Sequence, residues 1–373
     1  MANQASRVLH IGAWGRNWGD HAIKYSMHRS LTAAFEKRGL NDVEWHYEDV
    51  QTTDFDGYDF APYDLIIVGG GGLLWDKPEL KSYTGWQWQI PAEQLLKIEA
   101  PLVLYGLGWT RFPYHDPTGS EIMWSHLRIA ASKAALVSVR NAETRNLLKQ
   151  HGIPKTSHIP DPAIDIDSEP LSPIIKGKRI IGLCWASDKP EMRFGNQVRY
   201  DHWLESYAMY LNKITTDDDA VLMVEHIAGL DTEAREVFKA HLGDRFTSAE
   251  EIGMLEAFSE DDGTPKTENV PLFFSMYDHC AAVFSSRKHG IWIPAGKRIP
   301  ALGFGLLNEV GWTLKSVGMG PFDISPVDLE VWPGIVGAAL EHATDAGPAA
   351  YERSLPPLRR AVARFNGRVA ALL

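Results

Sequence analysis

The sequence predicts an α/β protein built from two Rossmann-like, doubly wound domains that face a cleft. Aliphatic runs typical of strands alternate with segments of helical periodicity, and several runs end in glycine-rich or polar turns. The alternation stops near residue 168 and begins again at residue 179. With 373 residues the chain is longer than one hydrophobic core usually serves, so two domains are expected.

Residues 1–168 are predicted to form the first domain. Its continuous, β-branched apolar runs are typical of buried parallel strands. The strands are expected at 8–11, 45–50, 64–68, 102–107 and 136–139, and the helices at 22–35, 122–134 and 144–151. Prolines, acidic residues and a lack of periodicity then indicate a linker, placed at 169–178.

Residues 179–345 are predicted to form the second domain. The strands are expected at 179–185, 220–225, 281–284 and 299–304, and the helices at 202–214, 232–242 and 271–279. Residues 346–373 are assigned to a C-terminal unit, in which a basic amphipathic helix is expected from Tyr351 to Leu373. We expect this helix to pack across both domains.

Composition limits the kinds of partner. A formal net charge of −11 argues against broad attraction to nucleic acid or to an anionic membrane. An anionic ligand would therefore need a local cluster of cations. No signal-peptide core and no apolar stretch of ~20 residues is visible, so a cytoplasmic protein without an integral membrane segment is expected. Cys184 and Cys280 lie in apolar runs and are predicted to be buried.

Glycines and polar residues follow the first predicted strand. Asn17, Gly19 and Asp20 lie in a turn that matches neither a dinucleotide-binding fingerprint nor a Walker motif. Asn17 and Asp20 are either caps of the next helix or ligand contacts, and the sequence does not separate the two. A glycine in such a turn lets a ligand approach the backbone closely.

Four consecutive glycines, Gly69 to Gly72, follow the predicted strand at 64–68. Without side chains, the backbone N–H groups of Gly70, Gly71 and Gly72 can face a ligand. The alternative is a loop packed tightly against a neighbouring segment. Because four glycines in a row lose much conformational entropy on folding, the ligand-binding interpretation is favoured.

Cations and a histidine lie where a late strand passes into a helix. Ser286, Arg287, Lys288 and His289 follow the apolar run at 281–284, and Gly290 leads into the next apolar segment. In open α/β sheets ligands bind at this end of the strands, and helix N-termini favour anions. The alternative is a charged surface turn.

The order of these motifs resembles the polysaccharide pyruvyl transferase family. The matching pieces, in chain order, are Asn17-x-Gly19-Asp20, Gly69 to Gly72, Ser138-Val139-Arg140, Pro160-Asp161-Pro162, Ser286-Arg287-x-His289-Gly290 and Pro300. No single piece is specific, but the ordered set from 17 to 300 is. The resemblance implies a fold like that of the two-domain GT-B glycosyltransferases.

The resemblance also implies a reaction. The family transfers the pyruvyl group of phosphoenolpyruvate to two hydroxyls of a sugar, which gives a pyruvate ketal and releases phosphate. An arginine in each half and a histidine two residues beyond the second arginine are the donor-site residues, and they carry over to Arg140, Arg287 and His289. The chain departs from the family at Lys288, where an apolar residue is usual, which leaves the role of this lysine open.

Each of these side chains has an expected task. Arg140 and Arg287 would hold the carboxylate and the phosphate of the donor, because guanidinium groups bind such anions bidentately. His289 would protonate the donor's methylene carbon as a general acid. Asp20, ranked above Asp161, would take the proton of an acceptor hydroxyl. The other candidates for donor or substrate binding are Asn17, Gly19, Gly70, Gly71, Gly72, Asp161, Ser286 and Lys288.

The expected partners follow from this reaction. They are phosphoenolpyruvate as co-substrate and a sugar or glycan acceptor, free or linked to a lipid or nucleotide, so that work at the inner membrane surface stays open. No metal, no other cofactor and no nucleic acid are expected, and homo-oligomerisation is left open. Two alternatives remain: a nucleotide-sugar-dependent glycosyltransferase of the same fold, and a non-catalytic protein that binds an anion or a glycan.

Overall fold

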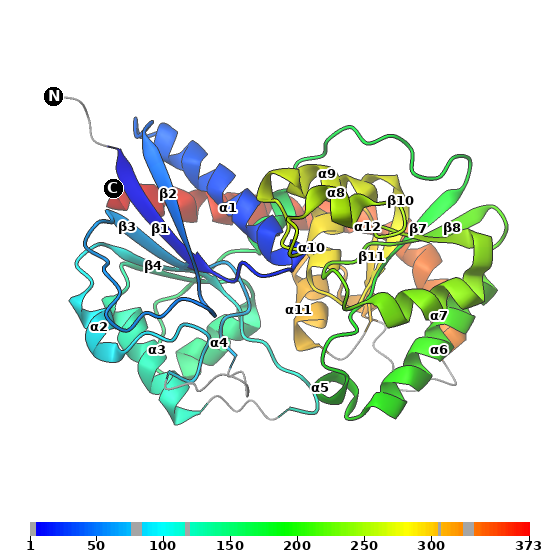
Figure 1. Ribbon diagram of the computed structural model, residues 1–373, viewed down its shortest axis with the longest axis horizontal. Coiled ribbons are helices and arrows are strands. Elements are labelled where there is room, and N and C mark those ends of the chain that lie inside the picture. The colour runs from blue at the N-terminus through cyan, green and yellow to red at the C-terminus, as the bar shows by residue number, and fades with distance from the viewer. Residues whose placement is uncertain (1–4, 76–83, 116–119, 305–306, 324–331) are drawn as a thin grey trace.

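A computed structural model describes residues 5–75, 84–115, 120–304, 307–323 and 332–373 of the protein. Figure 1 shows two α/β halves side by side, each with a central sheet flanked by helices. Within the described residues, all neighbouring strands of the two sheets run parallel. The predicted fold of two Rossmann-like, doubly wound sheets is confirmed.

The first sheet has six strands in the order β2-β1-β3-β4-β5-β6. The strands are β1 (Ser6–Gly12), β2 (Val43–Asp49), β3 (Leu65–Gly69), β4 (Leu102–Leu107), β5 (Leu136–Val139) and β6 (Ser157–His158). The helices are α1 (Trp18–Glu36), α2 (Ala92–Lys97), α3 (Glu121–Lys133) and α4 (Ala142–Gln150). Strands β3 and β4 are buried along their whole length, as expected for strands covered on both faces.

The second sheet has five strands in the order β11-β10-β7-β8-β9. The strands are β7 (Arg179–Cys184), β8 (Asp219–Met223), β9 (Phe246–Ser248), β10 (Cys280–Ser285) and β11 (Ala301–Gly303). The helices are α5 (Pro190–Phe194), α6 (Gln197–Ile214), α7 (Thr232–Leu242), α8 (Met254–Phe258), α9 (Val270–Phe274), α10 (His289–Gly296), α11 (Asn308–Ser316) and α12 (Trp332–Val369). Residues 166–178, between the two sheets, form neither helix nor strand.

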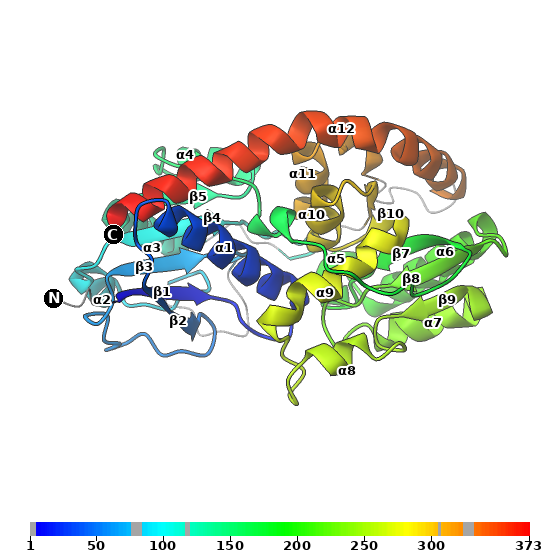
Figure 2. The same cartoon turned by 90° about the horizontal axis from the view of Figure 1, so that it is seen from above.

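The last helix is longer than the sequence predicts. Helix α12 begins at Trp332 rather than Tyr351, and it contains Pro348, Pro356 and Pro357. A proline inside a helix costs about 3 kcal/mol, and Pro348 lies just before the predicted start, so the sequence pattern places that start too late. Packing outweighs this cost: Tyr351 and Leu355 join the core of the second half, and Phe365 joins a core of the first half. Figure 2 shows α12 running across both halves.

Helix α1 also joins the two halves. Trp18, in its first turn, stacks on Phe273 of α9 with ring centroids 3.8 Å apart. The Trp18 N–H donates to the backbone carbonyl of His226, over 2.8 Å. The N-terminus of α1 is thereby fixed against the second half, at the point where the two sheets face each other.

In the part of the chain that the structure describes, no helix is both long and apolar enough to cross a membrane.

Candidate functional site

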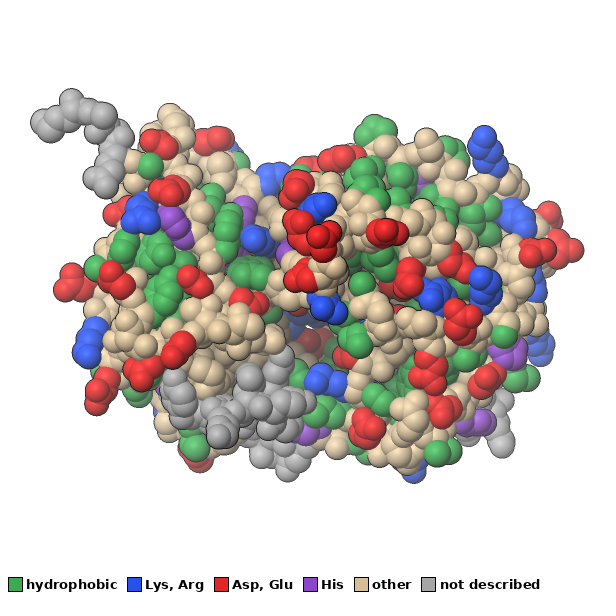
Figure 3. Space-filling model, in the orientation of Figure 1, with side chains coloured by type: hydrophobic (Ala, Val, Ile, Leu, Met, Phe, Trp, Pro, Cys, Tyr) green, Lys and Arg blue, Asp and Glu red, His purple; other side chains and the backbone are tan. Residues whose placement is uncertain are grey.

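A cavity of about 250 Å³ lies between the two halves. Strand ends of both sheets lead into it, as is usual for ligand sites in parallel α/β sheets. The residues that line it include Asn17, Asp20, Gly72, Trp75, Thr110, Asp188, Lys189, His226, Arg287, Lys288, His289 and Glu309. Figure 3 shows a hollow between the halves, with Lys and Arg side chains beside it.

The N-terminus of α1 forms one wall of the cavity. The Asn17 side chain caps the helix, since its Oδ1 accepts a hydrogen bond from the Gly19 N–H at 2.9 Å, and Asp20 lies in the first turn. Gly19 makes room for His289: a Cβ atom at this position would lie 1.9 Å from His289 Nδ1. Asn17 and Asp20 line the cavity, whereas Gly19 acts by letting the imidazole pack against the helix.

The glycine loop after β3 packs against β4 and, contrary to the prediction, does not present all of its N–H groups to the cavity. Gly70 donates its N–H to the Tyr105 carbonyl at 2.7 Å, so this N–H is not free for a ligand. Gly69 and Gly70 have positive φ angles, which glycine adopts without strain, and the chain turns there toward β4. Only Gly72 of the predicted set lines the cavity, so the expectation that Gly70 and Gly71 contact a ligand is corrected.

Arg140, at the end of β5, is buried between two carboxylates. Its Nη1 lies 3.5 Å from Asp161 Oδ2, and its Nη2 pairs with Glu309 of α11. Glu309 also accepts a hydrogen bond from the Thr110 hydroxyl at 3.1 Å, so this cluster joins the two halves. A Cβ atom at Gly108 would lie 2.0 Å from Arg140 Nε, which explains a glycine at that position.

Burial and nearby cations compete at both carboxyl groups. Burial alone would raise the pKa of Asp161, but His289, Lys288 and Arg140 outweigh it and lower the pKa. At Glu309 burial is likewise outweighed, here by Arg140 and Lys288, so its pKa is also lowered. Both groups are therefore carboxylates at neutral pH.

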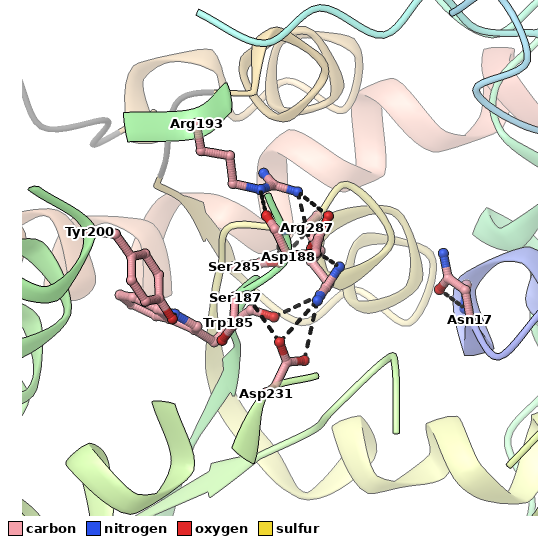
Figure 4. A network of polar contacts seen from close by, with 10 residues as sticks. Asn17, Trp185, Ser187, Asp188, Arg193, Tyr200, Asp231, Ser285 and Arg287 are labelled. Carbon is pink, nitrogen blue, oxygen red and sulfur yellow. Dashed lines mark hydrogen bonds and ion pairs between the residues drawn. The ribbon is translucent and has the colours of Figure 1, made fainter. Parts of the chain in front are cut away.

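Arg287, after β10, is held by the protein on all three guanidinium nitrogens (Figure 4). Nη2 donates to both oxygens of Asp231 at 3.0 and 3.2 Å, Nη1 lies 2.8 Å from Asp188, and Nε donates to the Trp185 carbonyl at 2.7 Å. Burial opposes its charge, but Asp231 and Asp188 raise its pKa. Asp188 is shared with Arg193, 3.2 Å away. The expected role of Arg287 as a free anion clamp does not match this arrangement.

Lys288 differs from the arginines. It is half-buried, lines the cavity, and makes no side-chain hydrogen bond or ion pair with any described residue. Burial lowers its pKa, and the Arg140 charge lowers it further. The N–H donors of the Lys288 ammonium group are therefore available to a ligand.

His289, the first residue of α10, is buried with Nε2 3.4 Å from Asp161 Oδ2. Burial lowers its pKa below the ordinary imidazole value, and Lys288 lowers it further, while Asp161 and Asp20 oppose the effect. The Ser286 hydroxyl beside it is buried and has no hydrogen-bond partner among the described residues. Ser286 is not among the residues that line the cavity.

Sequence analysis did not single out several residues that line the cavity. Among them are His226 after β8 and Glu309 on α11. A signal existed for His226, because Glu225-His226 directly follows an aliphatic strand, as the predicted site residues do. Glu309 carries no such signal, since its place beside Arg140 depends on how α11 packs.

The chain matches the sequence model of the polysaccharide pyruvyl transferase family over residues 17–308. No curated protein sequence matches it.

Among solved structures, several two-domain proteins share the fold. S. aureus MnaA in complex with UDP has a TM-score of 0.56 at 12% identity, over 97% of this chain and 97% of that chain. UDP-N-acetylglucosamine 2-epimerase from Rickettsia bellii has a TM-score of 0.54 at 10% identity, over 99% and 96%. An α,α-trehalose-phosphate synthase (UDP-forming) from Burkholderia vietnamiensis has a TM-score of 0.51 at 11% identity, over 98% and 99%. At these identities the likeness concerns the fold alone, which is GT-B-like.

Proposed function

The chain belongs to the polysaccharide pyruvyl transferase family, and we propose that it transfers the pyruvyl group of phosphoenolpyruvate to two hydroxyls of one sugar in a glycan or glycan precursor. The products are a pyruvate ketal and inorganic phosphate. Family membership makes the chain a transferase of polysaccharide biosynthesis. The donor and the ketal chemistry are the proposal. Their main support is that Lys288 and His289 line one cavity, and that Arg140 pairs with Glu309 of the same cavity wall.

Lys288 and Arg140 would bind the anionic groups of the donor. The Lys288 ammonium has no partner among the described residues, and Arg140 Nη1 is buried without a hydrogen bond there. A carboxylate or phosphate oxygen would complete the hydrogen bonding of both groups. Arg287 would instead stabilise the wall of the cavity through its ion pairs with Asp188 and Asp231.

His289 would act as the general acid. In the free protein its lowered pKa favours the neutral ring, because burial and the neighbouring Lys288 disfavour a second positive charge. A bound phosphoenolpyruvate brings several negative charges next to the ring and opposes both effects. The imidazolium then protonates the methylene carbon, while Asp161 on Nε2 orients the ring.

A nucleotide-sugar glycosyltransferase is the second candidate. It is favoured by one observation, the shared fold with S. aureus MnaA, which was solved with UDP. Ligand binding separates the candidates, because a ligand specific for the folded state adds about 2.7 kcal/mol at 100 times its Kd. We expect phosphoenolpyruvate to raise the melting temperature and UDP to leave it unchanged. Stabilisation by UDP without any by phosphoenolpyruvate would favour the glycosyltransferase instead.

Turnover provides the second arm of this test. We expect wild-type protein to release phosphate from phosphoenolpyruvate with p-nitrophenyl glycosides as acceptors, and His289→Asn to lose roughly 10²- to 10⁴-fold of this rate. His202→Asn, on the exposed side of α6, is the matched control and should keep the wild-type rate. Full activity of His289→Asn would exclude its role as the acid.

Arg287→Ala is a poor probe of the chemistry. It would leave Asp231 buried without its counterion and Asp188 with Arg193 alone, and breaking a buried pair in this way costs about 3–5 kcal/mol. Loss of activity in that variant would report on stability.

A further inference from the structure

A second histidine reaches the same cavity. His226 follows β8, is fully buried and lines the cavity, and its Nδ1 has no hydrogen-bond partner among the described residues. Its Nε2 lies 2.9 Å from the Tyr277 hydroxyl. Because buried polar groups are almost always hydrogen-bonded, a buried ring nitrogen without a partner, in a residue of the cavity wall, indicates a group on the ligand that completes its hydrogen bonding.

Both halves of the protein hold this residue in place. The His226 carbonyl accepts the Trp18 N–H at 2.8 Å, and Trp18 belongs to α1 of the first half. The ring of Phe274, on α9, meets the imidazole edge-on at 5.3 Å. The imidazole is thus fixed at the junction where donor and acceptor would meet, which is what a positioned acid–base group requires.

We propose that His226 is the general base that takes the proton of the attacking sugar hydroxyl through Nδ1. This inference rests on the proposed function, because it assigns a step of the same reaction.

The carboxylates of the cavity are less suited to this step. Asp161 accepts the Ala163 N–H through Oδ1, and its Oδ2 faces Arg140 and His289 at 3.5 and 3.4 Å. These contacts stabilise the charged form, so Asp161 is a weak base. Asp20 lies in the first turn of α1 and lines the same cavity, so it is the competing candidate that the test below separates from His226. The His226 ring, in contrast, has no ion pair with a described residue, and its Nδ1 has no hydrogen-bond partner there.

Tyr277 determines which nitrogen of the His226 ring carries the proton, and a general base needs Nδ1 unprotonated. Burial keeps the phenol protonated, since it raises the pKa of Tyr277 well above the ordinary value. The hydroxyl also has the Cys184 thiol as a hydrogen-bonding neighbour. If the phenol donates to the sulfur, it accepts from His226 Nε2–H, and Nδ1 then carries the lone pair.

The surroundings of the two histidines order their proton affinities. Burial lowers the pKa of His226 well below the ordinary value, and the charged groups that face it, Arg287 and His289, lower it further. At His289 the carboxylates Asp161 and Asp20 oppose burial. His289 therefore stays protonated up to a higher pH than His226 does. A general acid and a general base that act together need this order of proton affinity.

The proton count of the reaction balances with these two groups. His289 gives its proton to the methylene carbon, and a sugar oxygen bonds to the adjacent carbon while its proton passes to His226. The bond from that carbon to the phosphate oxygen then breaks, and the second hydroxyl adds and releases its proton to the departing phosphate. His226 returns its proton to His289 through solvent, so one methyl group, one ketal and one phosphate result.

The ring state can be tested without any turnover. ¹⁵N NMR of histidine-labelled protein, assigned by comparison with His226→Asn, reports which ring nitrogen carries the proton. We expect an unprotonated Nδ1 and a protonated Nε2 in the free protein at neutral pH. A protonated Nδ1 would overturn the proposal, because that nitrogen could not accept a proton.

Kinetics then tests the step itself. We expect His226→Asn to bind phosphoenolpyruvate in calorimetry like wild type, to lose roughly 10²- to 10⁴-fold in kcat, and to lose the fall of activity at acidic pH. His202→Asn again serves as the control with wild-type behaviour. If His226→Asn keeps the acidic fall while Asp20→Asn loses it, Asp20 is the base and the proposal is wrong. Absence of phosphoenolpyruvate binding to wild type would instead overturn the proposed function.

Discussion

Charge compensation decides what each buried cation can do. Arg287 is paired with Asp231 and Asp188, whereas Lys288 makes no hydrogen bond or ion pair with a described residue and is stabilised only from a greater distance by Glu309, Asp161 and Asp20. A guanidinium with every nitrogen occupied stabilises the cavity wall, and a lysine with free donors can bind a ligand. Lys288 is thus the cation that has hydrogen-bond donors left for the proposed donor substrate.

Lys288→Met tests this division of roles. Loss of a charged hydrogen bond of about 1.5–3 kcal/mol should raise KM for phosphoenolpyruvate roughly tenfold to a hundredfold. The ammonium lowers the pKa of His289, so its removal should also raise that pKa. The protonated acid then persists to higher pH, and the alkaline fall of kcat/KM should move upward.

Lys176→Met, in the exposed segment before β7, should change neither quantity. A pH profile of kcat/KM over the accessible range for both variants decides the matter. An unchanged KM in Lys288→Met would show that the lysine does not contact the donor.

Strand ends and helix starts place the site residues. Asn17 caps α1. The absence of a side chain at Gly19 lets His289 pack on that helix, and Gly108 leaves similar space for Arg140.

The end of β8 adds a buried acid, Glu225. Its Oε2 accepts the Ala249 N–H at 3.0 Å, and its Oε1 has no hydrogen-bond partner in the described part of the chain.

Glu225 should make stability depend on pH. Burial raises its pKa from 4.5 to about 7, so between these values the folded protein binds a proton that the unfolded chain has released. Stability contributed by this group therefore falls as pH rises through that window, and it stays lower above it. Glu225→Gln cannot ionise, so we expect it to exceed wild type by about 3 kcal/mol above the window.

Urea unfolding of both proteins at pH 4.5 and pH 8 measures this effect. The measurement at the lower pH is the control, because the advantage of the variant should be small there. An equal difference at both pH values would show that Glu225 does not titrate in this window.

Contacts across the molecule make the two halves depend on each other. We propose that residues 1–168 and 179–345 are separate domains joined by residues 169–178, and that the C-terminal helix ties them together. Phe365 of α12 meets Tyr105 of β4 edge-on at 5.4 Å, and Asn366 accepts the Tyr105 hydroxyl at 2.8 Å. At the cavity, Arg140 and Glu309 add a buried pair between the halves.

Phe365→Ala should therefore destabilise the first half, because it removes a core contact of α12, a helix that begins in the second half. We expect a loss of about 3–5 kcal/mol, as is usual when a buried phenylalanine is truncated. Arg364→Ala changes the exposed neighbour of Phe365 and should stay within about 0.5 kcal/mol of wild type. Denaturant unfolding of both variants tests this, and equal stabilities would show that α12 does not support the first half.

The sequence alone determined the alternation of strands and helices, the turns at strand ends and the motif order. These are local patterns, because apolar periodicity and glycine placement act within a few residues along the chain. They predicted the two-sheet fold and placed Asn17, Lys288 and His289 at strand ends that meet at the cavity. The predicted start of α12 was wrong because Pro348, just before it, is tolerated inside the helix through packing with distant residues.

Only the tertiary structure decided which charges meet. Arg287 pairs with Asp231, 56 positions away, and Arg140 with Glu309, 169 positions away. Such pairs depend on which strand ends and helices adjoin after folding, and no local periodicity encodes that choice. For the same reason Lys288 and His226 could be recognised as open to a ligand only once the partners of their neighbours were known.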